Sequence, residues 1–143
     1  MATGNKEIVR RVLEDVWTDE SVVDELVSPD YVGYDPAMPD PIRGPQGAKD
    51  NFKQYSDAFD GAHITVTEQI AEGDTVATRW EGRGTHTGTL MGVTPTGREI
   101  VVTGITITKI KNGKIVEDHT VWDTLGMLQQ IGAIPTGTAA QTG

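Results

Sequence analysis

The stretch EIVVTGITITKIKNGKIVEDHTVW, residues 99–122, decides the fold because apolar and polar side chains alternate along it on both sides of an Asn-Gly pair. Alternation of this kind is typical of half-buried strands, and Asn-Gly favours the tight turn of a β-hairpin. The stretch therefore predicts two antiparallel strands, at residues 99–110 and 114–122, with a turn at residues 111–114 between them.

Upstream of this hairpin, the same period of two predicts two further strands, at residues 64–72 and 75–89. The second of these contains Gly82, Gly84 and Gly88. Glycines inside a strand pattern mark bends or bulges, so this strand is expected to curl. The sequence therefore predicts a strongly bent antiparallel sheet of about four long strands.

The other periodic segments show the helical spacing of apolar side chains. Helices are predicted at residues 5–17, 21–27, 45–59 and 124–131. Asn5 and Ser21 are candidate N-caps for the first two helices, because their side chains accept hydrogen bonds from free backbone N–H groups. A short extended segment is predicted at residues 30–34. Three prolines within residues 35–41 exclude helix and central strand there, so a stiff loop precedes the third helix.

Helices first and a bent antiparallel sheet afterwards describe one α+β domain, which is predicted to span residues 1–135. Three helices over one face of a curled sheet are expected to enclose a cone-shaped cavity, and such cavities are the usual sites of small ligands. Residues 136–143 are small and polar, so a disordered tail is predicted there.

The composition excludes several classes of function. The 143 residues include 21 acidic and 12 basic side chains, and the net charge of −9 argues against a nucleic-acid partner. No apolar run is long enough to span a membrane and the N-terminus lacks the layout of a secretory signal, so a cytoplasmic protein is expected. The chain has no cysteine and only three scattered histidines, which argues against disulfides, thiol chemistry and a metal site.

A series of motifs along the chain resembles one known family. The motifs are IVRR (8–11), SPDY (28–31), GTHTG (84–88), GVTPTG (92–97), NGKIVE (112–117), WD (122–123) and GMLQQIG (126–132). In them the sequence resembles the SnoaL-like polyketide cyclase (ester cyclase) family of the NTF2-like superfamily, over nearly the whole chain. The resemblance implies an NTF2-like cone and a homodimer paired through the sheet. The polar side chains of Thr103, Thr106 and Thr108, which are expected on the outer face, are compatible with that pairing.

The resemblance also implies acid/base chemistry without a cofactor. Characterised cyclases of the family close a ring by intramolecular aldol condensation on a polyketide methyl ester. An acidic side chain takes a proton next to a carbonyl while the pocket stabilises the enolate. Their catalytic aspartate matches Val121, or Thr120 if no gap is allowed, and their partner histidine matches Thr106. Both positions depart from the family's pattern, so its chemistry does not carry over directly.

His119 and Asp123 are the candidate catalytic residues in place of that pair. They have the same parity on the last strand, so both are expected to face one side of the sheet. His119 is the candidate general base because imidazole titrates near neutral pH. The alternative interpretation is that His119 lies on the solvent-exposed face or at a subunit contact. Asp123 has a second interpretation as the N-cap of the last helix. Asp118, of opposite parity, is expected to be exposed to solvent.

Further residues are candidates for contact with an apolar small-molecule ligand. They are Tyr34, Asp35, Phe52, Trp80, His86 and Met91. Tyr34 and Asp35 flank the proline loop near the expected cavity mouth, where their alternative role is packing of the loop. His86 lies either at the rim of the pocket or pins the bend in its strand. For the aromatic residues and Met91 the alternative is core packing.

Three functions stay open on these residues. The first is a cofactor-free enzyme that performs an aldol-type cyclisation, or a related isomerase, lyase or hydrolase step, on an apolar carbonyl or ester compound. The second is a non-catalytic protein that binds an apolar small molecule and lacks the cyclase acid/base pair. The third is a dimeric scaffold with a vestigial, dry cavity of less than ~150 Å³ that is filled by its own side chains.

Overall fold

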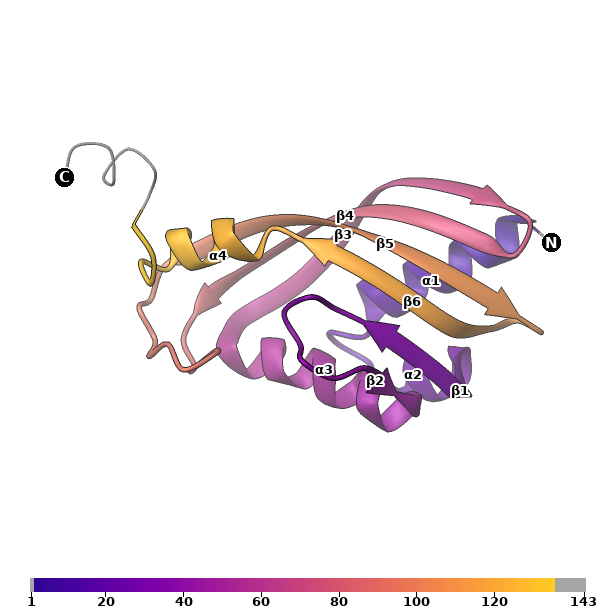
Figure 1. Cartoon of the computed structure of the whole chain (residues 1–143), viewed down its shortest axis with the longest axis horizontal. Helices are drawn as coiled ribbons and strands as arrows, with labels where there is room; N and C mark the ends of the chain where they lie inside the picture. The colour runs from indigo at the N-terminus through magenta and orange to yellow at the C-terminus, as the bar shows by residue number, and fades with distance from the viewer. Residues whose placement is uncertain (1, 136–143) are drawn as a thin grey trace.

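The computed structural model describes residues 2–135, in which one six-stranded sheet curls around three helices (Figure 1). The elements are α1 (Ala2–Asp15), α2 (Ser21–Leu26), β1 (Val27–Tyr34), β2 (Ile42–Arg43), α3 (Gly44–Ala58), β3 (Phe59–Glu72), β4 (Thr75–His86), β5 (Glu99–Lys111), β6 (Lys114–Trp122) and α4 (Thr124–Gln130). The predicted α+β class and the predicted order of helices and long strands are confirmed. The tail predicted at 136–143 lies outside the described residues.

The sheet is mixed rather than antiparallel. Its strand order is β2-β1-β6-β5-β4-β3, and β1 runs parallel to β6 while all other neighbours are antiparallel. The prediction of a purely antiparallel sheet is therefore wrong, since β1 and β2 add two strands to the four long ones. The pairing of β1 with β6 is interrupted between Val27 and Val32. Pro29 lies in that gap and has no N–H to donate, which made the strand look shorter in the sequence.

The bulges in the sheet lie in β3, whereas the predicted bends were at the glycines of β4, which pairs with β5 without interruption and ends at His86, before Gly88. The register between β3 and β4 shifts at two places, and bulges of this kind increase the local twist of a strand pair. Gly104 on β5 leaves room for the indole of Trp80 on β4, because a Cβ there would lie 2.4 Å from the Trp80 ring. The large indole therefore lies flat across the neighbouring strand on the inner face.

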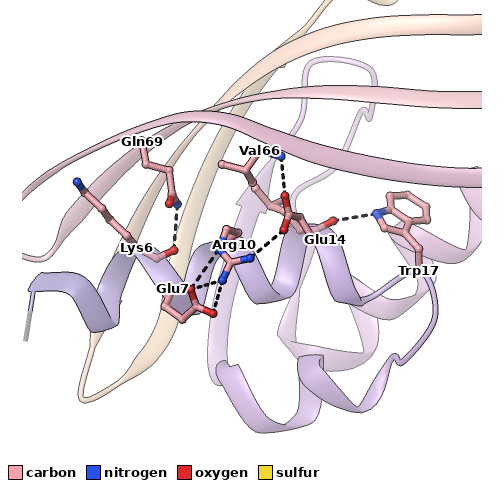
Figure 2. Close-up of polar contacts among 8 residues, drawn as sticks. Lys6, Glu7, Arg10, Glu14, Trp17, Val66 and Gln69 are labelled. Carbon is pink, nitrogen blue, oxygen red and sulfur yellow. Dashed lines mark hydrogen bonds and ion pairs between the residues drawn. The ribbon is translucent and has the colours of Figure 1, made fainter.

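Polar contacts fix α1 against β3 (Figure 2). The Val66 N–H, next to one of the register shifts, donates to Glu14 Oε2 at 2.8 Å instead of to a neighbouring strand. The Gln69 side chain donates to the carbonyl of Lys6 at 3.0 Å. These two bonds hold α1 above the concave side of the sheet. Arg10 forms an ion pair with Glu14 at 3.1 Å, which fixes the Glu14 carboxylate.

The N-caps predicted for the first two helices are not the ones that the structure uses. Asn5 lies inside α1, which begins at Ala2, so it does not cap that helix. The N-cap of α2 is Glu20, which makes no side-chain cap bond, and Asp19 accepts from the Ser21 N–H at 3.1 Å instead. Among residues 2–135, no helix combines the length and the apolar character that a membrane crossing needs.

The core consists of two clusters that flank the centre of the sheet. One cluster packs α1, α2 and α3 against β1, with Val9, Val12, Val23, Val27 and Ile115 among its buried members. The other packs the end of α3 and α4 against β4 and β5, with Phe59, Trp80, Val102, Met127 and Ile131 among its buried members. The space between the helices and the concave face touches both clusters, and this space contains the candidate site.

Candidate functional site

A cavity of about 140 Å³ lies between α1, α3 and the concave face of the sheet. Apolar side chains make up most of its wall, among them Val12, Leu13, Phe52, Trp80 and Val102. Its volume is close to that of an engineered apolar cavity of ~150 Å³ that binds benzene, and below the ~300 Å³ of pockets for drug-sized ligands. The volume agrees with that predicted for a vestigial cavity. The carboxyl and hydroxyl groups in the wall do not, because a vestigial cavity was predicted to be dry and filled by its own side chains.

Asp118 on β6 is an ionisable group in this wall. The hydroxyl of Thr108 donates to one carboxyl oxygen at 2.6 Å, and the hydroxyl of Tyr31 donates to the other at 3.0 Å. Burial raises the pKa of Asp118 above its ordinary value, and these two hydrogen bonds oppose that rise without cancelling it. The prediction that Asp118 is exposed to solvent is wrong, because β6 turns this residue inward beside the buried Thr108.

Tyr31 reaches Asp118 across 87 residues of sequence because Gly33 leaves room for it. A Cβ on Gly33 would lie 2.3 Å from the Tyr31 hydroxyl oxygen. Burial, and then the charge of Asp118, raise the pKa of Tyr31, so the phenol stays protonated. Tyr31 therefore acts as a fixed hydrogen-bond donor to the carboxyl group.

Further along the inner face of β6, Thr120 faces Thr106 on β5. The two hydroxyl oxygens lie 2.9 Å apart, and the Trp80 indole N–H donates to Thr106 at 3.0 Å. Thr106 and Thr108 are buried, so the prediction that they lie on the outer face with Thr103 is wrong for both. The Thr106–Thr120 pair is neutral and provides hydrogen bonds but no acid or base near neutral pH.

A second carboxyl group, that of Asp35, lies at the Trp122 end of the cavity. The Trp122 indole N–H donates to Asp35 Oδ1 at 3.0 Å, and the Ala37 N–H donates to the same oxygen at 2.8 Å. The hydroxyl of Tyr55 on α3 is buried next to the Asp35 carboxyl group. Burial, and then the charge of Asp35, raise the pKa of Tyr55, so this hydroxyl also stays protonated.

Comparison with known proteins assigns the chain to a family. The family model for the SnoaL-like polyketide cyclases matches residues 7–131. The chain belongs to this family. Aklanonic acid methyl ester cyclase DnrD of Streptomyces peucetius is 31% identical over 130 residues, which cover 88% of this chain and 89% of DnrD.

Solved structures agree with this assignment. A SnoaL-like protein of Jannaschia sp. CCS1 superposes with a TM-score of 0.84 at 23% identity, over 94% of this chain and 95% of that one. IdmH of Streptomyces antibioticus superposes with a TM-score of 0.78 at 30% identity, over 90% of this chain and 98% of IdmH. The predicted NTF2-like α+β fold is therefore confirmed, with more strands than predicted.

The resemblance matches Thr106 with the family's histidine, and Thr120 or Val121 with its aspartate. Thr106 and Thr120 both lie in the cavity wall. Of the alternatives for the aspartate position, Val121 is 69% exposed on the outer face, whereas Thr120 lines the cavity. Thr120 pairs in register with Thr106, the histidine position. Thr106 and Thr120 therefore form a hydrogen-bonded pair in the cavity wall, and the Asp118 carboxyl group lies two residues before Thr120 on the same strand.

The two residues predicted as catalytic lie outside the cavity lining. The side chain of His119 is 54% exposed, and its Nε2 lies 2.8 Å from the Glu117 carboxylate. Its ring stacks on Tyr34 with ring centroids 4.7 Å apart. Asp123 accepts from the Gly126 N–H at 2.8 Å, which confirms the alternative interpretation of Asp123 as the N-cap of α4.

Four of the six predicted ligand-contact residues line the cavity, namely Tyr34, Asp35, Phe52 and Trp80. His86 is fully buried outside the cavity lining, where its Nδ1 accepts from the Thr96 N–H at 3.2 Å. It holds the loop between β4 and β5 through Thr96, which differs from the predicted roles at the pocket rim and at the bend in its own strand. Met91 is 45% exposed in that loop and does not line the cavity either.

Sequence reasoning missed the group formed by Tyr31, Thr108 and Asp118. Tyr31 belongs to one of the motifs that carry the resemblance, but nothing local to it points to Asp118. The signal for Asp118 was the alternation along β6, which separates two faces without saying which face is buried. Only the register with β5 decides this, since it sets Asp118 beside Thr108.

Proposed function

We propose that this protein is a cofactor-free enzyme that performs acid/base chemistry on a small, mostly apolar carbonyl compound, with Asp118 as the proton acceptor. The observation that carries the proposal is the Asp118 carboxyl group, enclosed in a mostly apolar cavity and held by Tyr31 and Thr108. Enzymes tune catalytic carboxyl groups by such burial, because a raised pKa makes the carboxylate a stronger base.

The reaction proposed is an aldol-type cyclisation. The Asp118 carboxylate removes a proton from the carbon next to a carbonyl, and hydroxyl donors in the wall stabilise the resulting enolate. The enolate carbon then attacks a second carbonyl of the same molecule, and the alkoxide formed recovers the proton from Asp118. An isomerase would share the first step and return the proton to a different carbon.

The first step has a direct assay that needs no knowledge of the natural substrate. Exchange of the methyl protons of acetophenone in D₂O, followed by proton NMR, measures removal of a proton next to a carbonyl. We expect the wild-type protein to accelerate this exchange and Asp118→Asn to lose about 10²–10⁴-fold of the acceleration.

His119→Ala is the matched control, because it changes the neighbouring residue on the opposite face. We expect it to retain the wild-type exchange rate within about twofold, as is usual for exposed side chains. A loss in His119→Ala with a normal rate in Asp118→Asn would overturn the assignment and support the role that the sequence predicted for His119. Equal rates for wild type and Asp118→Asn would also overturn it.

The second candidate function is non-catalytic binding of the same kind of compound. The observation that favours it is the neutral Thr106–Thr120 pair at the positions of the family's histidine and aspartate. This function predicts that acetophenone binds to the protein while neither the wild type nor any variant accelerates exchange. Binding measured by calorimetry beside the exchange assay separates the two functions.

We also propose that the protein forms a homodimer through the outer face of β5 and β6. Exposed apolar side chains gather there, among them Ile105, Ile107 and Val121, and Ile105 pairs in register with Val121. Beside them Arg79 pairs with Glu68 and Glu117 pairs with His119, so the apolar side chains carry the proposed contact. Light scattering should give a dimer mass for the wild type and a monomer mass for Ile105→Lys. A wild-type monomer would overturn the proposal.

A further inference from the structure

We propose that Thr120 is the catalytic residue that binds the carbonyl oxygen of the ligand and stabilises the enolate, with Thr106 and Trp80 as positioning residues. The inference rests on the proposed function, because that function forms an enolate beside Asp118. It identifies which hydroxyl group of the cavity wall donates to the oxygen that becomes negatively charged.

Two hydroxyl groups of the wall are already committed to the base. Within residues 2–135, the cavity-lining residues with a hydroxyl group are Tyr31, Tyr34, Tyr55, Thr106, Thr108 and Thr120. A hydroxyl group has only one proton to donate. Tyr31 and Thr108 both donate theirs to Asp118, so they hold the base and cannot bind the carbonyl oxygen at the same time.

The other two tyrosines have partners of their own. The Tyr55 hydroxyl is buried, and the Asp35 carboxyl group is its side-chain hydrogen-bond partner. The Tyr34 ring stacks on His119, which lies on the outer face of β6. The threonine pair on β5 and β6 is therefore left to serve the ligand.

The hydrogen bond between the two threonines has a direction. The Trp80 indole N–H donates to Thr106 Oγ1 at 3.0 Å, and the hydroxyl oxygens of Thr106 and Thr120 lie 2.9 Å apart. Thr106 is only 3% exposed, and within residues 2–135 Thr120 is the one acceptor that the structure gives its hydroxyl group. A buried donor without an acceptor is costly, so Thr106 donates to Thr120.

This direction leaves the Thr120 proton to the ligand. Thr120 is only partly buried and lines the cavity, and its side chain makes no hydrogen bond within residues 2–135 besides the one with Thr106. Hydrogen bonds in a row polarise one another, so Trp80 and Thr106 make Thr120 a better donor. A fixed donor aimed at a developing negative charge is the basis of an oxyanion hole.

The spacing of Thr120 and Asp118 suits one enolising group. They lie two positions apart on the inner face of β6, which is ~7 Å between their Cα atoms. The carbonyl oxygen and the carbon that loses the proton are two bonds apart, so with a contact of ~3 Å at each end they span such a gap. Asp118 takes the proton, the C–H electron pair forms the carbon–carbon double bond, and the carbonyl electron pair moves to the oxygen. Thr120 donates a hydrogen bond to that oxygen and keeps its own proton.

The test is NMR of acetophenone labelled with ¹³C at its carbonyl carbon, bound to wild type, Thr120→Val, Thr120→Ser and Thr106→Val. A hydrogen bond to the oxygen moves the carbonyl resonance downfield. We expect a downfield shift at saturation in wild type that is kept in Thr120→Ser and lost in Thr120→Val, which has a similar shape without the hydroxyl group. Thr106→Val should give a smaller shift than wild type. Proton exchange on acetophenone should fall about 10²–10³-fold in Thr120→Val, the effect of one oxyanion donor.

The control is Thr103→Val, which makes the same change on the outer face of β5 and should keep both the shift and the exchange rate. The inference is overturned if wild type does not bind acetophenone, if the bound ligand shows no downfield shift, or if the shift survives in Thr120→Val. Normal exchange in Thr120→Val would remove this inference alone. A shift that depends on Thr120 in a protein that does not accelerate exchange would instead remove Asp118 as the base and keep Thr120 as the donor.

Discussion

The two faces of β6 alternate residue by residue but carry different chemistry. On the inner face, Asp118 and Thr120 line the cavity and bond to hydroxyl groups of other strands. On the outer face, Glu117 and His119 pair with each other at the surface, next to the exposed Val121. Asp118 and His119 are adjacent in sequence, yet Asp118 lies in the cavity wall, where burial raises its pKa, and His119 lies at the surface. The comparison shows that the candidate base is identified by its place in the cavity wall more than by its residue type.

The largest effect that separates the two faces is expected in the pH profile of proton exchange. Only ionised Asp118 is a base, so the rate should rise tenfold per pH unit up to a midpoint above 3.8, the ordinary pKa of this group. Since the Tyr31 hydrogen bond lowers the pKa of Asp118, Tyr31→Phe should move the midpoint to higher pH. Exchange rates measured between pH 4 and 9 test both statements.

A base on the outer face would give a different profile. A profile set by a group on that face would be insensitive to Tyr31→Phe, because the Tyr31 hydroxyl contacts Asp118 on the inner face. A midpoint that stays in place in Tyr31→Phe and disappears in His119→Ala would therefore reverse the comparison. Thr108→Val is a second check, because it removes the other hydrogen bond that lowers the pKa of Asp118.

The sequence predicted the positions of the long strands but not which face of them is buried. On β5, Ile100, Val102 and Ile110 point inward, while Ile105 and Ile107 point outward. With apolar residues on both faces, alternation indicates a strand without distinguishing core from surface. The inner and outer faces of β6 were exchanged in the prediction for this reason, and with them the environments of Asp118 and His119.

The candidate site was predictable only where it is local in sequence. Asp35 was found because it opens a proline-rich loop, and Trp80 because large aromatic residues line cavities. The bond from Tyr31 to Asp118 depends on the parallel pairing of β1 with β6. No pattern within either segment encodes that pairing, although the sequence predicted the extended part of β1 after Pro29.

A smaller effect should separate the two faces of β5. Thr106→Val removes the hydroxyl that accepts from the buried Trp80 indole N–H, and an orphaned buried donor costs about 1–3 kcal/mol. Thr103→Val makes the same change at an exposed position on the outer face of β5. There a loss of about 0.5 kcal/mol or less is expected. Urea unfolding measures both free energies. Equal losses would mean that the hydroxyl of Thr106 is not what stabilises the inner face.

The smallest effect concerns the end of the outer face. Asp123→Ala should cost about 1 kcal/mol of unfolding free energy, because it removes the oxygen that accepts from the Gly126 N–H at the start of α4. Asp123→Asn should keep most of that stability, since asparagine caps about as well as aspartate. Proton exchange should continue at the wild-type rate in both variants. A stable Asp123→Asn protein without exchange activity would instead make Asp123 catalytic and return the active carboxyl group to the position that the sequence predicted.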